Sequence, residues 1–141
     1  MKWLIMSNIT YKDLILDRTQ IKELYLDAGW FAYTNDCEKL YKGILNSTDC
    51  IGAYDKDLLV GLIRTISDGE TICHIQDILV LKKYQRRGIG KQLMSLIFDK
   101  YPHIRQILLM TEDTSETRLF YESMGMESYD KVKGLGFKLK K

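Results

Sequence analysis

The chain has 141 residues, of which 45% are hydrophobic and 28% are charged, a composition typical of a globular protein with one sizeable core. Its 21 basic and 19 acidic residues leave a formal net charge of +2, which is too small to indicate a nucleic-acid partner. No apolar run approaches the roughly 20 residues that a membrane-spanning helix needs, so we expect no membrane partner.

The start of the chain and its cysteines favour a cytoplasmic protein. Residues 1–6 contain one lysine but no long apolar segment and no small-residue cleavage site, so we expect no signal peptide. Cys37, Cys50 and Cys73 lack paired spacing, which is typical of reduced, mostly buried thiols. Without a repeat or a linker in the sequence, we expect a single domain over residues 1–141.

The first third of the chain predicts an edge strand and two helices. β-Branched and aromatic residues favour the strand over residues 3–11. Asp17 and its neighbours offer N-caps for a helix that Gly29 ends, and Asp36 caps a second helix that ends near Asn46. The apolar positions expected on these two helices are Ile21, Leu24, Tyr25 and Ala28, and then Leu40, Tyr41, Ile44 and Leu45.

The middle of the chain predicts an antiparallel meander. Apolar, β-branched runs over residues 50–54, 58–66 and 71–81 favour three strands. Polar turns over residues 55–57 and 67–70 separate them.

A basic turn with two glycines follows the third of these strands. Gly88 and Gly90 allow the backbone to bend and to approach a ligand closely. The apolar spacing of residues 92–98 predicts a helix whose first turn carries unpaired N–H groups and the positive end of the helix dipole. Three basic residues, Arg86, Arg87 and Lys91, surround it. This strand–turn–helix junction is typical of phosphate or pyrophosphate binding, although a solvated basic turn would look similar.

The last part of the chain predicts a buried strand over residues 106–110 and a helix that Thr114 or Ser115 caps and Gly125 ends. Residues 126–141 favour two further short strands. The resulting order, β-α-α-β-β-β-α-β-α-β-β, predicts a mixed α+β fold with one parallel strand pair. Such a sheet offers a cleft where the parallel neighbours separate at their carboxyl ends.

Two segments of the sequence resemble signatures of the GNAT superfamily of acyl-CoA-dependent N-acyltransferases. Gln85–Gly90 matches every fixed position of the first signature, which is Gln or Arg, two variable residues, Gly, one variable residue, then Gly or Ala. Phe120–Met126 resembles the second, an aromatic residue followed by Tyr-Glu-x-x-Gly-Phe, with Met126 where Phe is usual. The resemblance covers the whole chain and implies a mostly antiparallel sheet with a central parallel pair, flanked by about four helices.

The resemblance implies acetyl-CoA as acyl donor and a set of residues that hold it. Main-chain groups of the third meander strand would bind the pantetheine arm, and backbone N–H groups of the glycine turn would hold the pyrophosphate. Thr114 stands where many relatives carry an Asn that touches the cofactor. The residues implied are Ile78, Leu79, Val80, Gln85, Arg86, Arg87, Gly88, Ile89, Gly90, Lys91, Thr114 and Phe120. The strand's apolar side chains are equally expected in the core.

The resemblance also makes Tyr121 the candidate catalytic acid, because its phenol can give a proton to the departing thiolate. The alternative is a tyrosine packed between helix and sheet. Relatives that acetylate histones carry a base at the position of His74, whose imidazole could take the proton of the amine. Strand alternation places His74 and Gln76 on one face and Asp77, a rival base, on the other unless a bulge intervenes.

Two aromatic residues in the connection between the first two helices, Trp30 and Tyr33, are candidates for binding the acceptor amine. They could wall a pocket or stack on a cation, or could be ordinary core residues. Because nothing resembles a long peptide groove, a small primary amine is favoured over a protein lysine. Cys73 and His74 lack further ligands at suitable spacing, so we expect no metal site.

The sequence thus predicts a cytoplasmic GNAT-type N-acetyltransferase that acts by direct attack in a ternary complex. No cysteine falls in either signature, so we expect no acyl-cysteine. The alternative is a module that binds acyl-CoA without turnover. The missing Gly-Lys-Ser/Thr ending argues against a nucleotide site, and homodimerisation is an expectation from the family alone.

Overall fold

The computed structural model describes residues 3–141, and contacts within it divide the chain into two compact units. The first unit ends at Leu108 and the second comprises Leu109–Lys141. None of the helices in the described residues is long and apolar enough to cross a bilayer.

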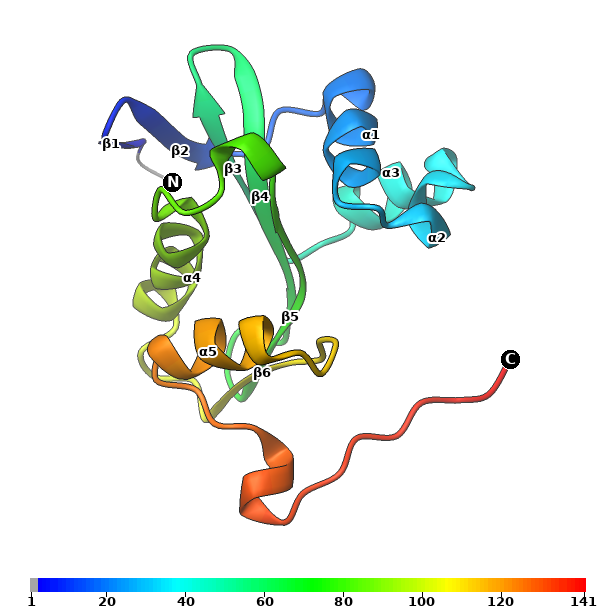
Figure 1. The fold of residues 1–141 in the computed structure, drawn as a ribbon, viewed down its shortest axis with the longest axis vertical. Coiled ribbons are helices and arrows are strands. Elements are labelled where there is room, and N and C mark those ends of the chain that lie inside the picture. Colours follow the sequence, from blue (N-terminus) through cyan, green and yellow to red (C-terminus); the bar gives the residue numbers. More distant parts are fainter. Residues whose placement is uncertain (1–2) are drawn as a thin grey trace. The chain divides into compact units, whose positions relative to one another are not determined.

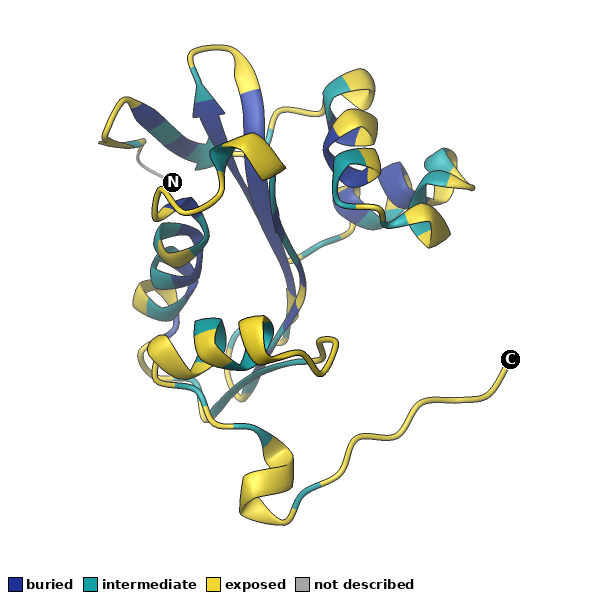
Figure 2. Cartoon of the chain, viewed as in Figure 1, coloured by how far each residue is buried: buried dark blue, intermediate teal, exposed yellow. Residues whose placement is uncertain are grey.

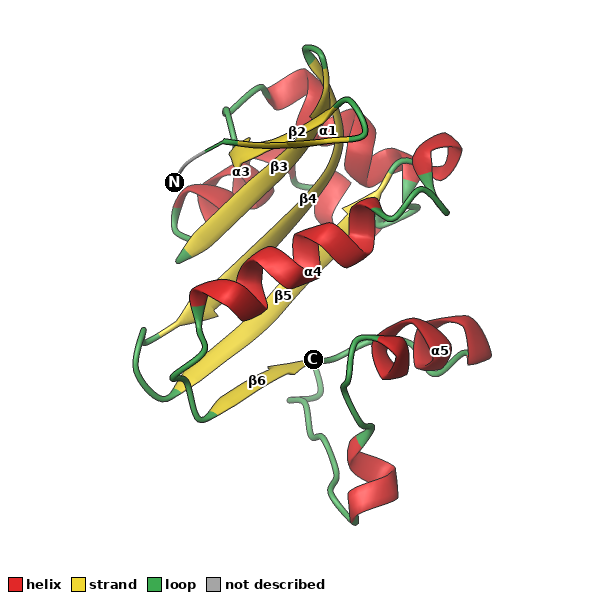
Figure 3. Cartoon of the chain, turned by 90° about the vertical axis from the view of Figure 1, so that its left-hand side faces the viewer, coloured by secondary structure: helices red, strands yellow, loops and turns green. Residues whose placement is uncertain are grey.

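A six-stranded sheet with the spatial order β1-β2-β3-β4-β5-β6 forms the centre of the fold (Figure 1). The pairs from β1 to β5 are antiparallel, and β6 runs parallel to β5 (Figure 3). The strands are β1 (Leu4–Met6), β2 (Ile9–Asp13), β3 (Asp49–Asp55), β4 (Leu58–Ser67), β5 (Ile72–Val80) and β6 (Gln106–Leu109). The mixed α+β class with a parallel pair is therefore confirmed.

The N-terminal segment forms a hairpin, so the single edge strand predicted over residues 3–11 is wrong. Ser7 and Asn8, with φ of 50° and 68°, form its turn between β1 and β2. Two consecutive positive φ values match the right-handed twist of a two-residue hairpin, and Asn tolerates this conformation better than most residues.

Helices cover both faces of this sheet. The helices α1 (Arg18–Asp27), α2 (Phe31–Thr34) and α3 (Cys37–Leu45) lie on one face, and α4 (Ile89–Lys100) lies on the other (Figures 1 and 3). The predicted N-caps are confirmed: Asp17 accepts a hydrogen bond from the Gln20 N–H (3.1 Å) and Asp36 from the Lys39 N–H (3.2 Å). The aromatic connection predicted for residues 30–35 contains α2.

Apolar side chains between the sheet and α1–α3 form a buried cluster. Figure 2 marks the buried residues along the strands and on these helices. Its buried members are Ile21, Leu24, Tyr25, Leu40, Tyr41, Ile44, Tyr54, Leu59, Leu62 and Leu79. The cluster confirms most of the predicted helix faces. Leu45 is the exception, because it ends α3 one residue past the buried Ile44 and is 65% exposed.

A β-bulge interrupts the pairing of β4 with β5. The Cα partners change from Arg64 and Asp77 to Thr65 and Ile75, so Gln76 is an extra residue without a partner on β4. A bulge of this kind lets residues that simple alternation would separate share one face of the sheet.

The second unit contains the helix α5 (Ser115–Ser123) and the 3₁₀ helix η2 (Tyr129–Val132). Thr114 caps α5 as predicted, and its hydroxyl accepts a hydrogen bond from the Thr117 N–H (3.1 Å). The two strands predicted for residues 126–141 are wrong: outside η2 the described chain is irregular there. The alternating apolar residues of this tail, Leu135, Phe137 and Leu139, remain 79–91% exposed, and a strand forms only against a neighbour.

On the α4 face of the sheet, the buried carboxylate of Asp49 forms a polar cluster. It accepts hydrogen bonds from Thr65 Oγ1 (2.5 Å) and from the Tyr101 hydroxyl (2.6 Å), and it pairs with the Lys100 ammonium. Burial alone would raise the pKa of Asp49, but the hydrogen bonds from Lys100, Thr65 and Tyr101 outweigh it and lower that pKa. The cluster ties the C-terminal end of α4 to β3 and β4.

We expect Asp49→Asn to lower the free energy of unfolding by about 1–3 kcal/mol at pH 7, because the variant loses charge-assisted hydrogen bonds at a buried position. The folded-state pKa lies below the unfolded value, so the carboxylate stabilises the fold above about pH 4 and this contribution is lost as the pH falls through the folded-state pKa. Urea denaturation between pH 3 and pH 7 should therefore show a smaller loss of stability on acidification in the variant. Equal stability of the two proteins at pH 7 would contradict this role.

Candidate active site

The glycine turn connects the end of β5 to the first residue of α4. The chain leaves β5 at Val80, passes through the 3₁₀ helix η1 (Lys82–Tyr84) and enters α4 at Ile89. Gly88 is the N-cap, with a left-handed φ of 80°, and no side chain in residues 3–141 caps this helix. The first N–H groups of α4 therefore remain available at the positive end of the helix dipole.

Close packing positions this turn against the sheet. A Cβ on Gly61 would lie 3.1 Å from the Leu79 carbonyl oxygen and 3.4 Å from Ile89 Cγ2. The missing side chain therefore lets the buried first residue of α4 sit directly on β4 and β5. The Gln85 amide closes the turn by donating to the Val80 carbonyl (3.2 Å).

The basic side chains of the turn are exposed, and one of them is held by an aromatic ring. The Arg87 guanidinium lies 4.7 Å from the ring centroid of Tyr84, whose hydroxyl donates to Asp55 (2.7 Å). Arg86 has a left-handed backbone, with φ of 64°. The exposed cations, Arg86, Arg87 and Lys91, surround the open end of α4, an arrangement suited to an anion.

β5 has nine residues, whereas its parallel neighbour β6 has four. The shorter strand can pair with only part of β5, so main-chain groups in the rest of β5 have no partner on β6. Leu79 points into the core cluster, and Ile78 and Val80 are half-buried. The Leu79 side chain therefore packs in the core, as the sequence also allowed.

The bulge brings the predicted base and its rivals to one face of the sheet. His74 pairs with Ile66, and Asp77 pairs with Arg64, two residues earlier on β4. Because paired residues share a face, as do residues two apart, His74 and Asp77 lie on the same side. The sequence allowed this arrangement only with a bulge, and Gln76 is the extra residue that changes the alternation.

Asp77 is the centre of a buried polar network on this face. Arg64 Nε donates to its Oδ2 atom (2.5 Å), and the hydroxyls of Tyr25 and Tyr33 donate to Oδ2 (2.9 Å) and Oδ1 (2.8 Å). Burial alone would lower the pKa of Arg64, but the hydrogen bond and charge of Asp77 outweigh it and raise that pKa. A carboxylate committed to a guanidinium and two phenols is a poor candidate for a general base.

Three aromatic rings lie beside this network. The ring centroid of Tyr25 is 5.9 Å from that of Trp30 and 5.2 Å from that of Tyr33, both in edge-to-face contact, and Trp30 and Tyr33 are 6.3 Å apart. The structure therefore brings the predicted acceptor residues Trp30 and Tyr33 together and links them to β5 through Asp77. One signal of this link is present in the sequence itself: Arg64 is a charged residue inside an apolar strand.

The other predicted residues lie in the second unit. Phe120 and Tyr121 are half-buried in α5, with ring centroids 5.1 Å apart in edge-to-face contact. Burial raises the pKa of the Tyr121 phenol, and a hydrogen bond with the Thr111 side chain partly offsets the rise. The Thr114 hydroxyl is engaged as the cap of α5.

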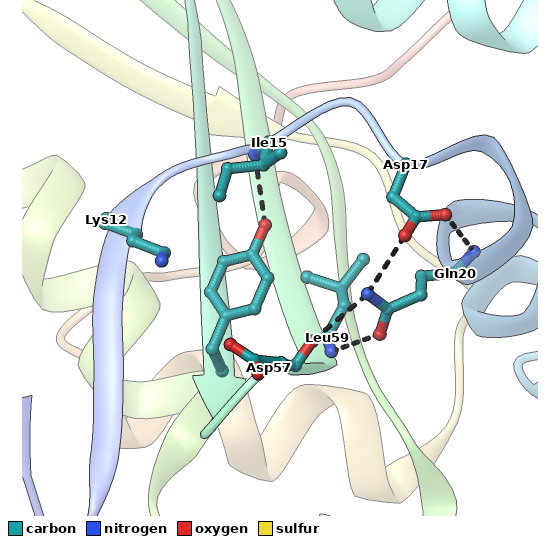
Figure 4. Close-up of a pocket in the computed structure, with 7 residues that line it drawn as sticks. Lys12, Ile15, Asp17, Gln20, Asp57 and Leu59 are labelled. Atoms are coloured by element: carbon teal, nitrogen blue, oxygen red, sulfur yellow. Dashed lines mark hydrogen bonds between the residues drawn. The ribbon is translucent and has the colours of Figure 1, made fainter.

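A separate pocket of about 170 Å³ lies between the β2–α1 connection and the β3–β4 turn (Figure 4). The Gln20 side chain crosses it, accepting from the Leu59 N–H (2.7 Å) and donating to the Asp57 carbonyl (3.1 Å). The Tyr54 hydroxyl accepts from the Ile15 N–H (3.0 Å). The described residues that line it include none of the predicted site residues.

The mixed sheet, the open N-terminus of α4 and the partly unpaired β5 define a protein suited to a long, phosphate-bearing cofactor. The family model described as the acetyltransferase (GNAT) domain matches residues 15–133, and the chain belongs to this family. GNAT acetyltransferases use acetyl-CoA as their acyl donor.

Individual proteins agree with this assignment. A GNAT-family acetyltransferase from Streptococcus pneumoniae TIGR4 is 34% identical, with a TM-score of 0.84 over 94% of this chain and 98% of its own. A candidate acetyltransferase from meticillin-resistant Staphylococcus aureus is 26% identical, with a TM-score of 0.80 over 94% and 99% of the two chains. A candidate acetyltransferase of Gibberella zeae is 32% identical over 79 residues, which are 54% of this chain and 44% of that protein.

We expect Arg64→Met to destabilise the first unit by about 3–5 kcal/mol, because it leaves the buried Asp77 carboxylate without its counter-ion. The double variant Arg64→Met/Asp77→Asn removes that uncompensated charge and should recover part of the loss. Urea denaturation of the wild type, both single variants and the double variant measures the coupling. Strictly additive effects would contradict the ion pair.

Proposed function

We propose that this chain transfers the acetyl group of acetyl-CoA to the primary amine of a small molecule, by direct attack within a ternary complex. The observation that carries the proposal is the open N-terminus of α4 at Gly88, directly beyond the strand whose main chain is partly unpaired. The pyrophosphate of acetyl-CoA would accept hydrogen bonds from the N–H groups of residues 87–91. Arg86, Arg87 and Lys91 would add positive charge, and the pantetheine arm would follow Ile78–Val80.

In the proposed reaction the neutral amine nitrogen attacks the thioester carbonyl carbon. A bond from carbon to nitrogen forms, the bond from carbon to sulfur breaks, and the electron pair leaves with the coenzyme A sulfur. Tyr121 gives the thiolate its proton, and its raised pKa keeps the phenol protonated for this task. The amine loses its proton to His74, directly or through water.

Two features support a small amine as acceptor. Trp30 and Tyr33 offer aromatic surface beside the bulge, where a cation or an apolar body could pack. Asp77 is neutralised by Arg64, so it adds no net negative charge for a polycation. The remaining parts of the proposal are a cytoplasmic location, a homodimer, and no nucleic-acid or membrane partner.

A thiol-release assay with acetyl-CoA and a panel of amines, amino acids, polyamines, aminoglycosides and peptides tests the proposed activity directly. We expect release with at least one small primary amine and none without an acceptor. Binding of coenzyme A without release across the panel would contradict catalysis and favour a non-catalytic acyl-CoA-binding module.

Gly88→Ala should weaken coenzyme A binding about tenfold, because an L-residue at φ of 80° costs about 1–2 kcal/mol and shifts the N–H groups of the turn. Gly69→Ala is the matched control: its φ is also 80°, and a Cβ at either glycine meets no atom within 4 Å. Titration calorimetry with coenzyme A should show weaker binding only in Gly88→Ala. Equal affinities of the two variants would contradict the proposed cofactor turn.

Tyr121→Phe should lower kcat by about 10²–10⁴-fold, as expected for loss of a general acid, and leave the coenzyme A affinity within about twofold. Because the Tyr121 pKa is raised above that of an ordinary phenol near 10, the wild-type kcat should show no loss from its ionisation up to about pH 9.5. An alkaline fall of kcat with a midpoint below pH 9 that vanishes in Tyr121→Phe would contradict this assignment.

A further inference from the structure

The hydroxyl of Tyr33 joins α2 to two strands of the sheet. It donates to Asp77 Oδ1 (2.8 Å) and accepts from Gln76 Nε2 (3.0 Å) on β5 and from a terminal nitrogen of Arg64 (3.2 Å) on β4. A phenol oxygen has one proton and two lone pairs, so these three hydrogen bonds use its full capacity. The hydroxyl is therefore committed to holding α2 rather than to binding a ligand.

α2 depends on such an external tie. It comprises only four residues, which is far below the length at which a helix is stable alone. Its N-cap, Trp30, makes no side-chain hydrogen bond to the helix within the described residues, and none of the four helical residues is buried. α2 packs against α1 and α3, and the rings of Trp30 and Tyr33 pack on the core cluster. Within the described residues, the Tyr33 hydroxyl adds directional hydrogen bonds that join α2 to β5.

Two tyrosine hydroxyls donate hydrogen bonds to Asp77, and they differ in the helix from which they come. The Tyr25 hydroxyl donates to Oδ2 from α1, inside the core, where its side chain is 0% exposed. The Tyr33 hydroxyl donates to Oδ1 from the half-buried α2. Both donors have the same chemistry and the same acceptor, but only Tyr33 fixes the segment beside the bulge.

We propose that Tyr33 is a positioning residue for the acceptor: its hydroxyl latches α2 against the bulge of β5 and so sets the affinity for the amine. The inference rests on the proposed function for the identity of the second substrate. The latch joins the acceptor-side residue Trp30 to the strand that carries His74 and Gln76. Its loss removes the hydrogen bonds that fix α2 to β5 and loosens α2, while the cofactor turn at the end of β5 keeps its own contacts.

Tyr33→Phe and Tyr25→Phe, which both keep the ring, form the test. With the best amine from the panel, Tyr33→Phe should raise the acceptor KM about tenfold and leave kcat and the acetyl-CoA KM within about twofold. Tyr25→Phe should leave all three within about twofold, although both variants lower Tm. Equal acceptor KM changes in the two variants, or none in Tyr33→Phe, would overturn the proposal.

A second measurement requires no turnover. The chain has two tryptophans, so Trp3→Phe leaves Trp30, 6.3 Å from the Tyr33 ring, as the single indole emitter. In this background, Tyr33→Phe should about double acrylamide quenching of Trp30, and Tyr25→Phe should not change it. If no amine is acetylated, the proposed function fails, and this quenching difference alone decides whether the latch exists. Equal quenching in the two variants overturns the latch even in an active enzyme.

Discussion

The ion pair between Arg64 and Asp77 is the interaction on which the attachment of α1 and α2 to the bulged part of β5 depends. Removing both charges from water costs several kcal/mol per ion, and one contact does not repay that cost. Here the hydroxyls of Tyr25 and Tyr33 also donate hydrogen bonds to the Asp77 carboxylate. Arg64 donates a further hydrogen bond to the Ser47 hydroxyl (3.3 Å). The pair stands at the last regular position before the bulge, so it fixes the register of β4 and β5 where the strand departs from regular pairing.

The next residue on β4, Thr65, anchors a helix to the opposite face of the sheet. Thr65 points toward α4 and donates to Asp49, which also binds Tyr101 at the end of that helix. Arg64 and Thr65 are consecutive, so one dipeptide at the centre of the sheet anchors helices on both sides. Each anchor is polar and directional. It therefore selects one arrangement of strand and helix, which apolar packing alone specifies less sharply.

The sequence predicted the features that depend on residues close together in the chain, and it could not predict those that depend on contacts between distant segments. Helix caps such as Asp17 and Asp36 act over three residues, and the glycine turn is a continuous segment, so both could be read directly. The bulge at Gln76 could not, because it depends on the register between two strands. Alternation alone therefore could not decide which face Asp77 occupies.

In the C-terminal tail, residues 126–141, the sequence pattern predicted strands that the described structure does not contain. Leu135, Phe137 and Leu139 alternate as strand residues do, yet a strand exists only beside a partner, which the local pattern does not contain. In the same way, Arg64 in an apolar run indicated a buried charge, but its partners come from α2, from β5 and from Ser47 in the connection after α3. The residues of the candidate site could be named from motifs, whereas the network that positions them required the fold.

In the proposed reaction, one strand would serve both substrates. Its main chain beyond the bulge would hold the donor, and its side chains at the bulge are tied to the segment proposed for the acceptor. α1 connects the two ends: Tyr25 binds Asp77, and Asp27, the last residue of the helix, accepts a hydrogen bond from the Lys82 N–H (2.8 Å) at the entrance to the glycine turn. Since Asp77 is neutralised, specificity for the amine would arise from shape and aromatic contact beside α2. A charge attraction to that carboxylate would add little.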